Sequence, residues 1–218
     1  MFDVGRSSFK TPLYDINVTF EWLQNNLALM GGVPTVWNNQ GKTKFKGEDM
    51  KFKFCPFCGR RLQTTANGNK KRLYCDPCGW THYRNPTVGV AVVLLKNDEL
   101  LLVKRNGSYE GMWCIPCGHV EYNEDIRVAA KREFKEETGL DVDVGPVFAV
   151  HSNFHDLENQ TVGIWFLGTY TGGKLEAGSD ASEVKFFPPD DLPEEMAFPT
   201  DLMVCEQIKV SNESSKTN

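Results

Sequence analysis

Apolar residues in the second half of the chain follow two different spacings, and each spacing predicts a different kind of element. The run at residues 87–95 is almost entirely apolar, which is typical of a strand buried on both faces. A polar turn at residues 96–99 leads to a second apolar run at residues 100–105, so we expect the two strands to pair. Further strands are expected at residues 142–152, 161–170 and 184–187.

A helical spacing of apolar residues lies between these strand signals. Residues 125–138 are rich in good helix formers, and Gly139 provides a stop at the C-terminal end. The apolar positions of this helix are Ile126, Val128, Ala129, Ala130 and Phe134. A second helix is expected at residues 200–209. Strands on both sides of a helix, without a regular strand–helix–strand repeat, predict an α+β fold.

The first helix carries a cluster of acidic residues. Glu133, Glu136 and Glu137 are three and four positions apart, so a helix places them on one face. Like charges at this spacing destabilise an isolated helix, whereas hard cations such as Mg²⁺ and Mn²⁺ bind carboxylate and phosphate oxygens together. Arg132 is positioned to hold one of the carboxylates by a bidentate pair. A solvated acidic helix face is the alternative interpretation.

Four cysteines in the first half of the chain form two CxxC pairs. Cys55 and Cys58 are followed, after sixteen residues, by Cys75 and Cys78. This spacing is typical of a tetrahedral four-thiolate zinc site, which is closed and structural. The stretch between the pairs is expected to form a hairpin that turns at residues 67–69. Redox-active or disulfide-bonded pairs are the alternative interpretation.

Charge is divided unevenly along the chain. The 218-residue chain has a formal net charge of -5, but residues 42–72 contain ten Lys or Arg against two acidic residues. A basic zinc-binding module is thus joined to an acidic domain. No apolar run reaches the roughly 18 residues that cross a bilayer, and no secretory pattern is found at the start. We therefore expect a cytoplasmic protein without membrane contact, in a compartment that keeps CxxC thiols reduced.

These patterns divide the chain into four parts. In residues 1–49, a weak strand pattern and a short helical pattern precede a stretch rich in Gly, Asn and Lys, which is typical of a linker. The expected order of this segment is left open. The other three parts are a small zinc ribbon at residues 50–84, a larger domain at residues 85–210 and a polar tail at residues 211–218.

The residues around the first helix match a known pattern. Gly118 is followed after five residues by Glu124 and, after seven more, by the sequence REFKEETG, which starts at Arg132. This arrangement resembles the Nudix box, and a solvated acidic helix does not account for the upstream glycine and glutamate. A ribbon directly before such a domain resembles the NADH pyrophosphatase and ADP-ribose pyrophosphatase branch of the Nudix hydrolases. The resemblance implies an α/β/α sandwich with a mixed sheet.

The resemblance also implies a divalent-metal-dependent hydrolase. Its reaction would cleave the pyrophosphate bond in a nucleoside diphosphate linked to another moiety, either an ADP-ribose-like compound or a dinucleotide such as NAD(H). Mg²⁺ or Mn²⁺ would be the catalytic cofactor and Zn²⁺ the structural one. By position in the box, Glu133, Glu136 and Glu137 are implied as catalytic residues and metal ligands, with Arg132 as a further catalytic residue. Cys117 stands where the family usually has a glycine whose backbone carbonyl binds metal.

Residues outside the box complete the candidate site. Arg105 is a candidate phosphate contact, and Phe154 is a candidate for stacking on a nucleobase. The general base of the family often lies on a later loop, which makes Glu183 a candidate, with an exposed loop acid as the alternative. Residues 151–156 read HSNFHD, where NADH pyrophosphatases carry a signature of the type SQPWPFPxS. The sequence therefore leaves the substrate within the branch open.

Two further features allow more than one interpretation. Cys114 and Cys117 form a third CxxC, for which a redox switch or soft-metal site competes with a turn into the box, and the turn is favoured. The basic ribbon also allows nucleotide sensing or nucleic-acid binding without turnover, which the complete set of carboxylates disfavours. The expected partner is thus a small nucleotide; a homodimer is compatible with the resemblance, and nucleic acid is not favoured.

Overall fold

The computed structural model describes residues 52–67, 70–156 and 159–216. The elements expected within residues 1–49 lie outside these ranges. The small sheet consists of β1 (Gln63–Asn67), β2 (Lys70–Cys75) and β3 (Trp80–Thr81). The larger domain consists of β4 (Thr87–Lys96), β5 (Glu99–Arg105), β6 (Trp113–Cys114), β7 (Cys117–His119), α2 (Ile126–Thr138), β8 (Leu140–Asn153), β9 (Thr161–Gly173), β10 (Ala181–Phe187) and α3 (Pro199–Lys216).

The hairpin expected between the two CxxC pairs is present in the small sheet. β1 and β2 pair antiparallel, from Gln63 opposite Tyr74 to Asn67 opposite Lys70. Residues 68 and 69, at the predicted turn, lie outside the described part of the chain. β3 then adds to β2, giving the order β1-β2-β3. The prediction of a hairpin is confirmed by this pairing.

The larger sheet is mixed. Its strands follow the order β10-β5-β4-β9-β8, with β6 beside β5 and β7 beside β4. β4 and β9 run parallel, whereas the remaining pairs in this sheet are antiparallel. Each strand predicted from apolar spacing within residues 85–210 falls within an observed strand. The expected mixed sheet is therefore confirmed.

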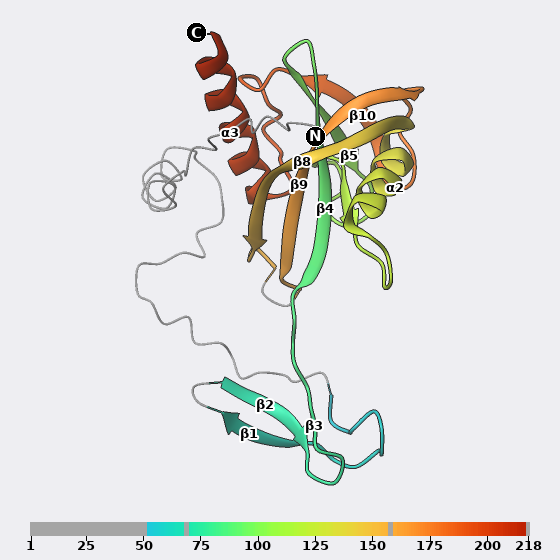
Figure 1. Cartoon of the computed structure of the whole chain (residues 1–218), viewed down its shortest axis with the longest axis vertical. Helices are drawn as coiled ribbons and strands as arrows, with labels where there is room; N and C mark the ends of the chain where they lie inside the picture. The colour runs from blue at the N-terminus through green and yellow to red at the C-terminus, as the bar shows by residue number, and fades with distance from the viewer. Residues whose placement is uncertain (1–51, 68–69, 157–158, 217–218) are drawn as a thin grey trace, which may run out of the picture. The chain divides into compact units, whose positions relative to one another are not determined.

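Helices α2 and α3 cover opposite faces of this sheet (Figure 1). Val90 and Val92 of β4 pack in one apolar cluster with Phe134 of α2. The neighbouring Val93 packs in a second cluster with Ile208 of α3. Since side chains alternate between the faces of a strand, burial of both faces explains why the run at residues 87–95 is continuously apolar. The α/β/α sandwich implied by the family resemblance is confirmed.

Helix α2 begins and ends at residues that the sequence indicates. The Asp125 carboxylate caps the helix by accepting hydrogen bonds from the backbone N–H groups of Arg127 and Val128. Gly139, with φ of 72°, ends it in the left-handed conformation. The Val128 side chain is exposed. It lies six residues before the buried Phe134, which at 3.6 residues per turn places it about 240° around the helix and off the packed face.

Helix α3 is longer than the predicted residues 200–209. It begins at Pro199, a residue favoured at the first helical position, and continues through residues 211–216, which we expected to belong to a polar tail. Ile208 is buried against the sheet, and a helix anchored in this way extends by one backbone hydrogen bond per added residue without needing apolar side chains. No helix in the described ranges combines the length and apolar character needed to span a membrane.

Asp201, in the first turn of α3, is a buried carboxylate that links this helix to the sheet. Its Oδ1 accepts a hydrogen bond from Trp165 Nε1 at 3.0 Å, and its Oδ2 accepts one from the backbone N–H of Ile115 at 2.9 Å. Burial raises the pKa of Asp201 to about 7, although both hydrogen bonds and the Arg105 charge act in the opposite direction. Between pH 3.8 and about 7, the folded chain therefore retains a proton on Asp201 that the unfolded chain has released.

This proton makes stability depend on pH. Between the ordinary Asp value of 3.8 and about 7 the folded state binds more protons than the unfolded state, so stability falls as pH rises through this window. Across this window, the deprotonation of Asp201 lowers the free energy of unfolding by an amount on the order of 4 kcal/mol. We expect Asp201→Asn to reduce the pH dependence of the free energy of unfolding across the window, as measured by urea denaturation. The exposed Asp190→Asn control should keep the parental slope, and an unchanged slope in Asp201→Asn would contradict the prediction.

Candidate active site and zinc centre

Helix α2 places its three candidate ligands in three different environments. The Glu137 side chain is the most enclosed, since the residue is only 2% exposed. Its Oε2 accepts a hydrogen bond from the backbone N–H of Cys117 in β7 at 2.9 Å. Glu133 is half-buried and Glu136 is exposed. The helix therefore presents a set of carboxylates that runs from the protein interior to solvent.

Gly118 is required by the close approach of α2 to β7. A Cβ atom built at this position would lie 2.0 Å from the carboxylate carbon of Glu133, and within 2.3 Å of both its oxygens. Any side chain at residue 118 would therefore displace the Glu133 carboxylate. The preceding Cys117 does not have a positive φ, so cysteine meets no backbone penalty in place of the family's usual glycine. Asn123, in the loop before α2, adopts a positive φ of 66°, which asparagine tolerates better than most other non-glycine residues.

Arg132 connects the loop before the helix to two of the carboxylates on it. Its Nε and Nη2 atoms donate to the two oxygens of Glu124, both at 2.8 Å, so the bidentate pair is made with Glu124 in the preceding loop and not, as expected, with one of the three helix glutamates. Its Nη1 lies 2.8 Å from Glu133 Oε1 and 3.5 Å from Glu136 Oε2. The hydrogen bonds from Arg132, with one from the backbone of Glu121, lower the pKa of Glu124 to about 2. Arg132 thus holds an ionised Glu124 and compensates part of the negative charge of the cluster.

Glu137 carries the strongest electrostatic perturbation of the cluster. Burial raises its pKa to about 8, and the Cys117 N–H acts in the opposite direction. The charges of Asp180 and Glu133 raise this pKa further, while that of Arg105 lowers it. A carboxylate in this environment ionises readily only when a positive charge comes close. Its surroundings therefore fit a cation that binds through hard oxygen ligands.

The three helix carboxylates are not gathered around one point. Within the described ranges, the ribbon cysteines are the one set of three or more potential ligands whose donor atoms all lie within 4.8 Å of one another. Glu133 and Glu136 are drawn toward Arg132, whereas Glu137 is held by the Cys117 N–H. The backbone of Cys117 is brought beside Glu137. Its carbonyl as a metal ligand stays a prediction, as do the ligand roles of the three glutamates.

Arg105 is largely enclosed by other protein groups at the end of β5. Its side chain is 14% exposed and its Nη2 lies 3.1 Å from Asp180 Oδ2. Its Nε donates to Ser108 O at 3.0 Å, and its Nη1 lies 3.8 Å from Cys114 Sγ. At least three of its five N–H donors therefore have protein partners. Arg105 as a phosphate contact stays a prediction.

The later acidic segment differs from the expectation for a loop base. Glu183 lies within strand β10, opposite Lys104 of β5, and is exposed; its placement in a loop was therefore wrong. Asp180, three residues earlier, is the carboxylate that pairs with Arg105 and influences Glu137. The sequence offered only its presence in the same acidic segment as a signal. Phe154 lies directly after β8 and is 55% exposed, which leaves its ring accessible for stacking.

The third CxxC spans the short turn from β6 to β7. Cys114 is buried and Cys117 is half-buried. A hydrogen bond with Cys114 and burial raise the pKa of the Cys117 thiol well above its ordinary value. A protonated thiol is a poor nucleophile and a poor metal ligand. This chemistry favours the turn interpretation over a redox or soft-metal site.

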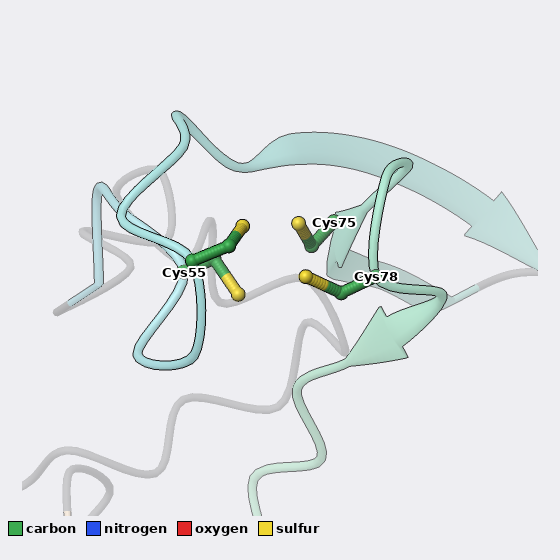
Figure 2. Close-up of side chains that lie close together, drawn as sticks. Cys55, Cys75 and Cys78 are labelled. Carbon is green, nitrogen blue, oxygen red and sulfur yellow. The ribbon is translucent and has the colours of Figure 1, made fainter.

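The ribbon cysteines form a compact four-sulfur cluster. The sulfur atoms of Cys55, Cys58, Cys75 and Cys78 all lie within 4.8 Å of one another, and Figure 2 shows Cys55 facing Cys75 and Cys78. A tetrahedral Zn²⁺ with four Zn–S bonds of about 2.3 Å needs S–S separations of about 3.8 Å. The thiols thus need only small movements to hold zinc. The glycine after each pair adopts nearly the same left-handed φ, 69° and 68°, so the two CxxC turns end in the same backbone conformation.

Comparison with known proteins agrees with this geometry. Residues 85–206 match the family model described as NUDIX domain, and residues 53–84 match the one described as Nudix N-terminal. The chain is 35% identical to an ADP-ribose pyrophosphatase of Methanocaldococcus jannaschii over 132 residues, which are 60% of this chain and 78% of that protein. It is 27% identical to the NAD-capped RNA hydrolase NudC of Stutzerimonas stutzeri over 142 residues, which are 65% of this chain and 50% of that protein.

Solved structures show the same fold. A NUDIX hydrolase from Nitrosomonas europaea superposes with a TM-score of 0.62 at 28% identity, covering 72% of this chain and 89% of that one. The chain spans about half the length of the NudC relatives. The NUDIX domain match nevertheless covers more than half of the chain, and it contains the complete box. This protein therefore belongs to the Nudix hydrolase family and carries the zinc ribbon that precedes the catalytic domain in some of its members.

Proposed function

We propose that this protein hydrolyses the pyrophosphate bond of a nucleoside diphosphate linked to another moiety, with Mg²⁺ or Mn²⁺ as the catalytic cofactor. The substrate class is an ADP-ribose-like compound or a dinucleotide such as NAD(H). One observation carries the proposal: the buried Glu137 carboxylate is fixed on the Cys117 N–H beside Glu133, which lies against Gly118. A binding module that never cleaves its ligand has no need for such a costly acidic cluster.

The box residues have distinct roles in this proposal. Glu133, Glu136 and Glu137, together with the Cys117 carbonyl, would hold the divalent ions. When bound, such ions neutralise the pyrophosphate, lower the pKa of a bound water and stabilise the leaving oxygen. Arg132 fixes the direction of the Glu133 carboxylate through a contact of 2.8 Å.

Two carboxylates compete for the role of general base. Asp180 has one oxygen in an ion pair with Arg105 at 3.1 Å. Glu183 is exposed on β10, where it can meet a water molecule. Because the ion pair occupies Asp180, we keep Glu183 as the base and assign Asp180 to holding Arg105 in position.

The named relatives support the substrate class and add a second candidate. The relative whose alignment with this chain spans 78% of its own length is named ADP-ribose pyrophosphatase. Several others are named NAD-capped RNA hydrolase. RNA carrying NAD at its 5′ end is therefore the second candidate substrate. The ribbon favours it through its exposed Phe52 and Phe54, which alternate along the chain with Lys51 and Lys53.

A substrate panel tests the proposed function. Full-length, zinc-loaded protein with Mg²⁺ or Mn²⁺ is incubated with ADP-ribose, NADH, a nucleoside triphosphate and NAD-capped RNA, and products are identified by mass. We expect cleavage within the pyrophosphate of the linked nucleotides, and at least a 100-fold lower kcat in Glu137→Gln. A folded, metal-loaded sample that releases no phosphate-containing product from any compound would reject hydrolysis and favour nucleotide sensing.

Paired variants test the assignment of the general base. Glu183→Gln should lower kcat by roughly 100-fold or more while leaving the fold intact, because a positioned base contributes about 10²–10⁴-fold to the rate. Asp180→Asn should have a smaller effect, exerted through the position of Arg105. Steady-state kinetics at several pH values measures both variants. Near-normal turnover in Glu183→Gln would rule out Glu183 as the base.

Zinc content tests the structural role of the ribbon. We expect about one Zn²⁺ per chain in the parent protein, because four thiolates close a single tetrahedral site. Cys78→Ser should lose most of this zinc, as measured by inductively coupled plasma mass spectrometry. Cys205→Ala removes a buried cysteine of α3 and should keep the zinc. Disulfide-bonded ribbon cysteines without zinc would instead support the redox interpretation.

A further inference from the structure

The backbone of Cys117, at the start of β7, is oriented by the pairing of this strand with β4. The N–H of Val92 in β4 donates to the carbonyl of Pro116 at 3.1 Å, and the N–H of Val120 donates to the carbonyl of Val88 at 3.0 Å. Along an antiparallel pair, residues that bond to the neighbouring strand alternate with residues that do not. Cys117 is one position from Pro116, so its N–H and C=O groups point away from β4.

The edge of β7 that points away from β4 faces the acidic helix. The Cys117 N–H donates to Glu137 at 2.9 Å, and the carbonyl of His119 accepts a hydrogen bond from Arg132 Nη2 at 3.3 Å. Cys117 and His119 are two positions apart, so their backbone polar groups lie on the same side of the strand. The Cys117 carbonyl therefore points toward α2. Its direction is set by the contacts of the backbone that precedes it.

Asp201 fixes this preceding backbone from the opposite face of the sheet. Its Oδ2 accepts a hydrogen bond from the N–H of Ile115 at 2.9 Å, two residues before Cys117. The intervening Pro116 has a ring that restricts its own φ, and its carbonyl is bound by the N–H of Val92. Both residues before Cys117 are thus held by their backbone groups. A displacement of Ile115 would be passed on to the Cys117 carbonyl.

Asp201 is itself held in place by two other elements. Its Oδ1 accepts a hydrogen bond from Trp165 Nε1 in β9 at 3.0 Å, and its N–H donates to the carbonyl of Phe198 at 3.0 Å. The Asp201 side chain is inaccessible to solvent, and Trp165 is buried in the cluster between the sheet and α3. Since both carboxylate oxygens accept hydrogen bonds, the side chain has a fixed orientation. Asp201 thus connects a paired strand of the sheet to the turn before the box.

Stability alone does not account for a carboxylate at this position. Ile115, Trp165 and Cys205, which bond to Asp201 or follow it by one helical turn, all belong to one buried apolar cluster. Burial there raises the pKa of Asp201. Removing a carboxylate from water costs free energy that burying an apolar side chain does not. This cost indicates a requirement for the two acceptor oxygens, one of which serves the segment that leads into the box.

We propose that Asp201 is a positioning residue for the divalent-metal site. By holding the Ile115 N–H, it fixes the direction in which the Cys117 carbonyl points toward α2. The proposal rests on the proposed function, in which this carbonyl and the three helix glutamates hold the ions. Removing a group that orients a metal ligand typically weakens metal binding by roughly 10-fold to 100-fold. Asp201 should therefore affect metal affinity although it lies on the other face of the sheet.

Mn²⁺ binding, measured without substrate, tests this role. Full-length, zinc-loaded protein is titrated with Mn²⁺, and the free ion is measured by electron paramagnetic resonance. Asp201→Ala removes both acceptor oxygens, and we expect it to weaken Mn²⁺ binding by roughly 10-fold. Ile208→Ala loosens the packing of α3 but keeps the Asp201 carboxylate, so it should bind Mn²⁺ as the parent does. Parental affinity in folded Asp201→Ala, or equal losses in both variants, would overturn the proposal.

A more conservative variant separates the bond to Ile115 from the bond to Trp165. In Asp201→Asn, one amide oxygen faces two N–H donors, because an amide nitrogen does not accept hydrogen bonds. Adding Trp165→Phe removes one donor, so the amide oxygen can accept from Ile115. The double variant should be less stable to urea, because the smaller ring leaves a cavity, yet bind Mn²⁺ more tightly than Asp201→Asn. If Asp201 only stabilises the fold, metal binding follows stability, and a double variant that binds Mn²⁺ no more tightly would reject the positioning role.

Failure of this proposal and failure of the proposed function give different results. If the substrate panel gives no product but Asp201→Ala weakens Mn²⁺ binding, hydrolysis is rejected and the positioning role stands. If ADP-ribose is cleaved and Asp201→Ala reaches half its maximal rate at the parental Mn²⁺ concentration, hydrolysis stands and the positioning role is rejected. We expect Asp201→Ala to need roughly 10-fold more Mn²⁺ and to approach the parental kcat at saturating Mn²⁺, because Asp201 orients a ligand and not the reacting groups.

Discussion

The approach of helix α2 to strand β7 is the contact on which the candidate active site depends. Glu137 reaches the backbone N–H of Cys117, and Glu133 lies directly over Gly118. Gly118 allows this approach because it has no side chain. The contact also explains the electrostatics of the site, since burying Glu137 near Glu133 and Asp180 disfavours its ionised form. A divalent cation offers the compensating charge, so the packing of one helix prepares the site for a metal.

The short segment before the box is held from both faces of the sheet. The backbone N–H of Cys117 is bound by Glu137 of α2, and the backbone N–H of Ile115 is bound by Asp201 of α3. Both carboxylates are buried, and burial raises both pKa values, to about 8 for Glu137 and about 7 for Asp201. The two helices thus fix residues only two positions apart. This arrangement gives the start of the box a defined position on the sheet.

Segments outside the box bring three aromatic rings together beside Arg105. Tyr109 and His155 lie in loops and Phe198 lies directly before α3; their ring centroids are 5.3 to 5.6 Å apart, and the Arg105 guanidinium carbon lies 5.5 Å from the centroid of the Phe198 ring. Loops of this kind vary while the sheet stays constant, which lets one catalytic arrangement serve different nucleotides. The HSNFHD segment contains His155, whose ring contacts those of Tyr109 and Phe198. The zinc ribbon has its own four-sulfur cluster and is built independently of these groups.

The sequence by itself determined the features that depend on local spacing. The strands, the start and end of α2, the box and the CxxC ligands all follow from residues close together in the chain. Even there, the extended α3 was not expected, since the length of this helix depends on contacts with the sheet. Only the tertiary structure revealed the contacts of Asp180, of Asp201 and of the aromatic rings of Tyr109, His155 and Phe198. Their partners lie between 36 and 89 residues away in sequence, and no periodic pattern encodes a contact made by folding the sheet.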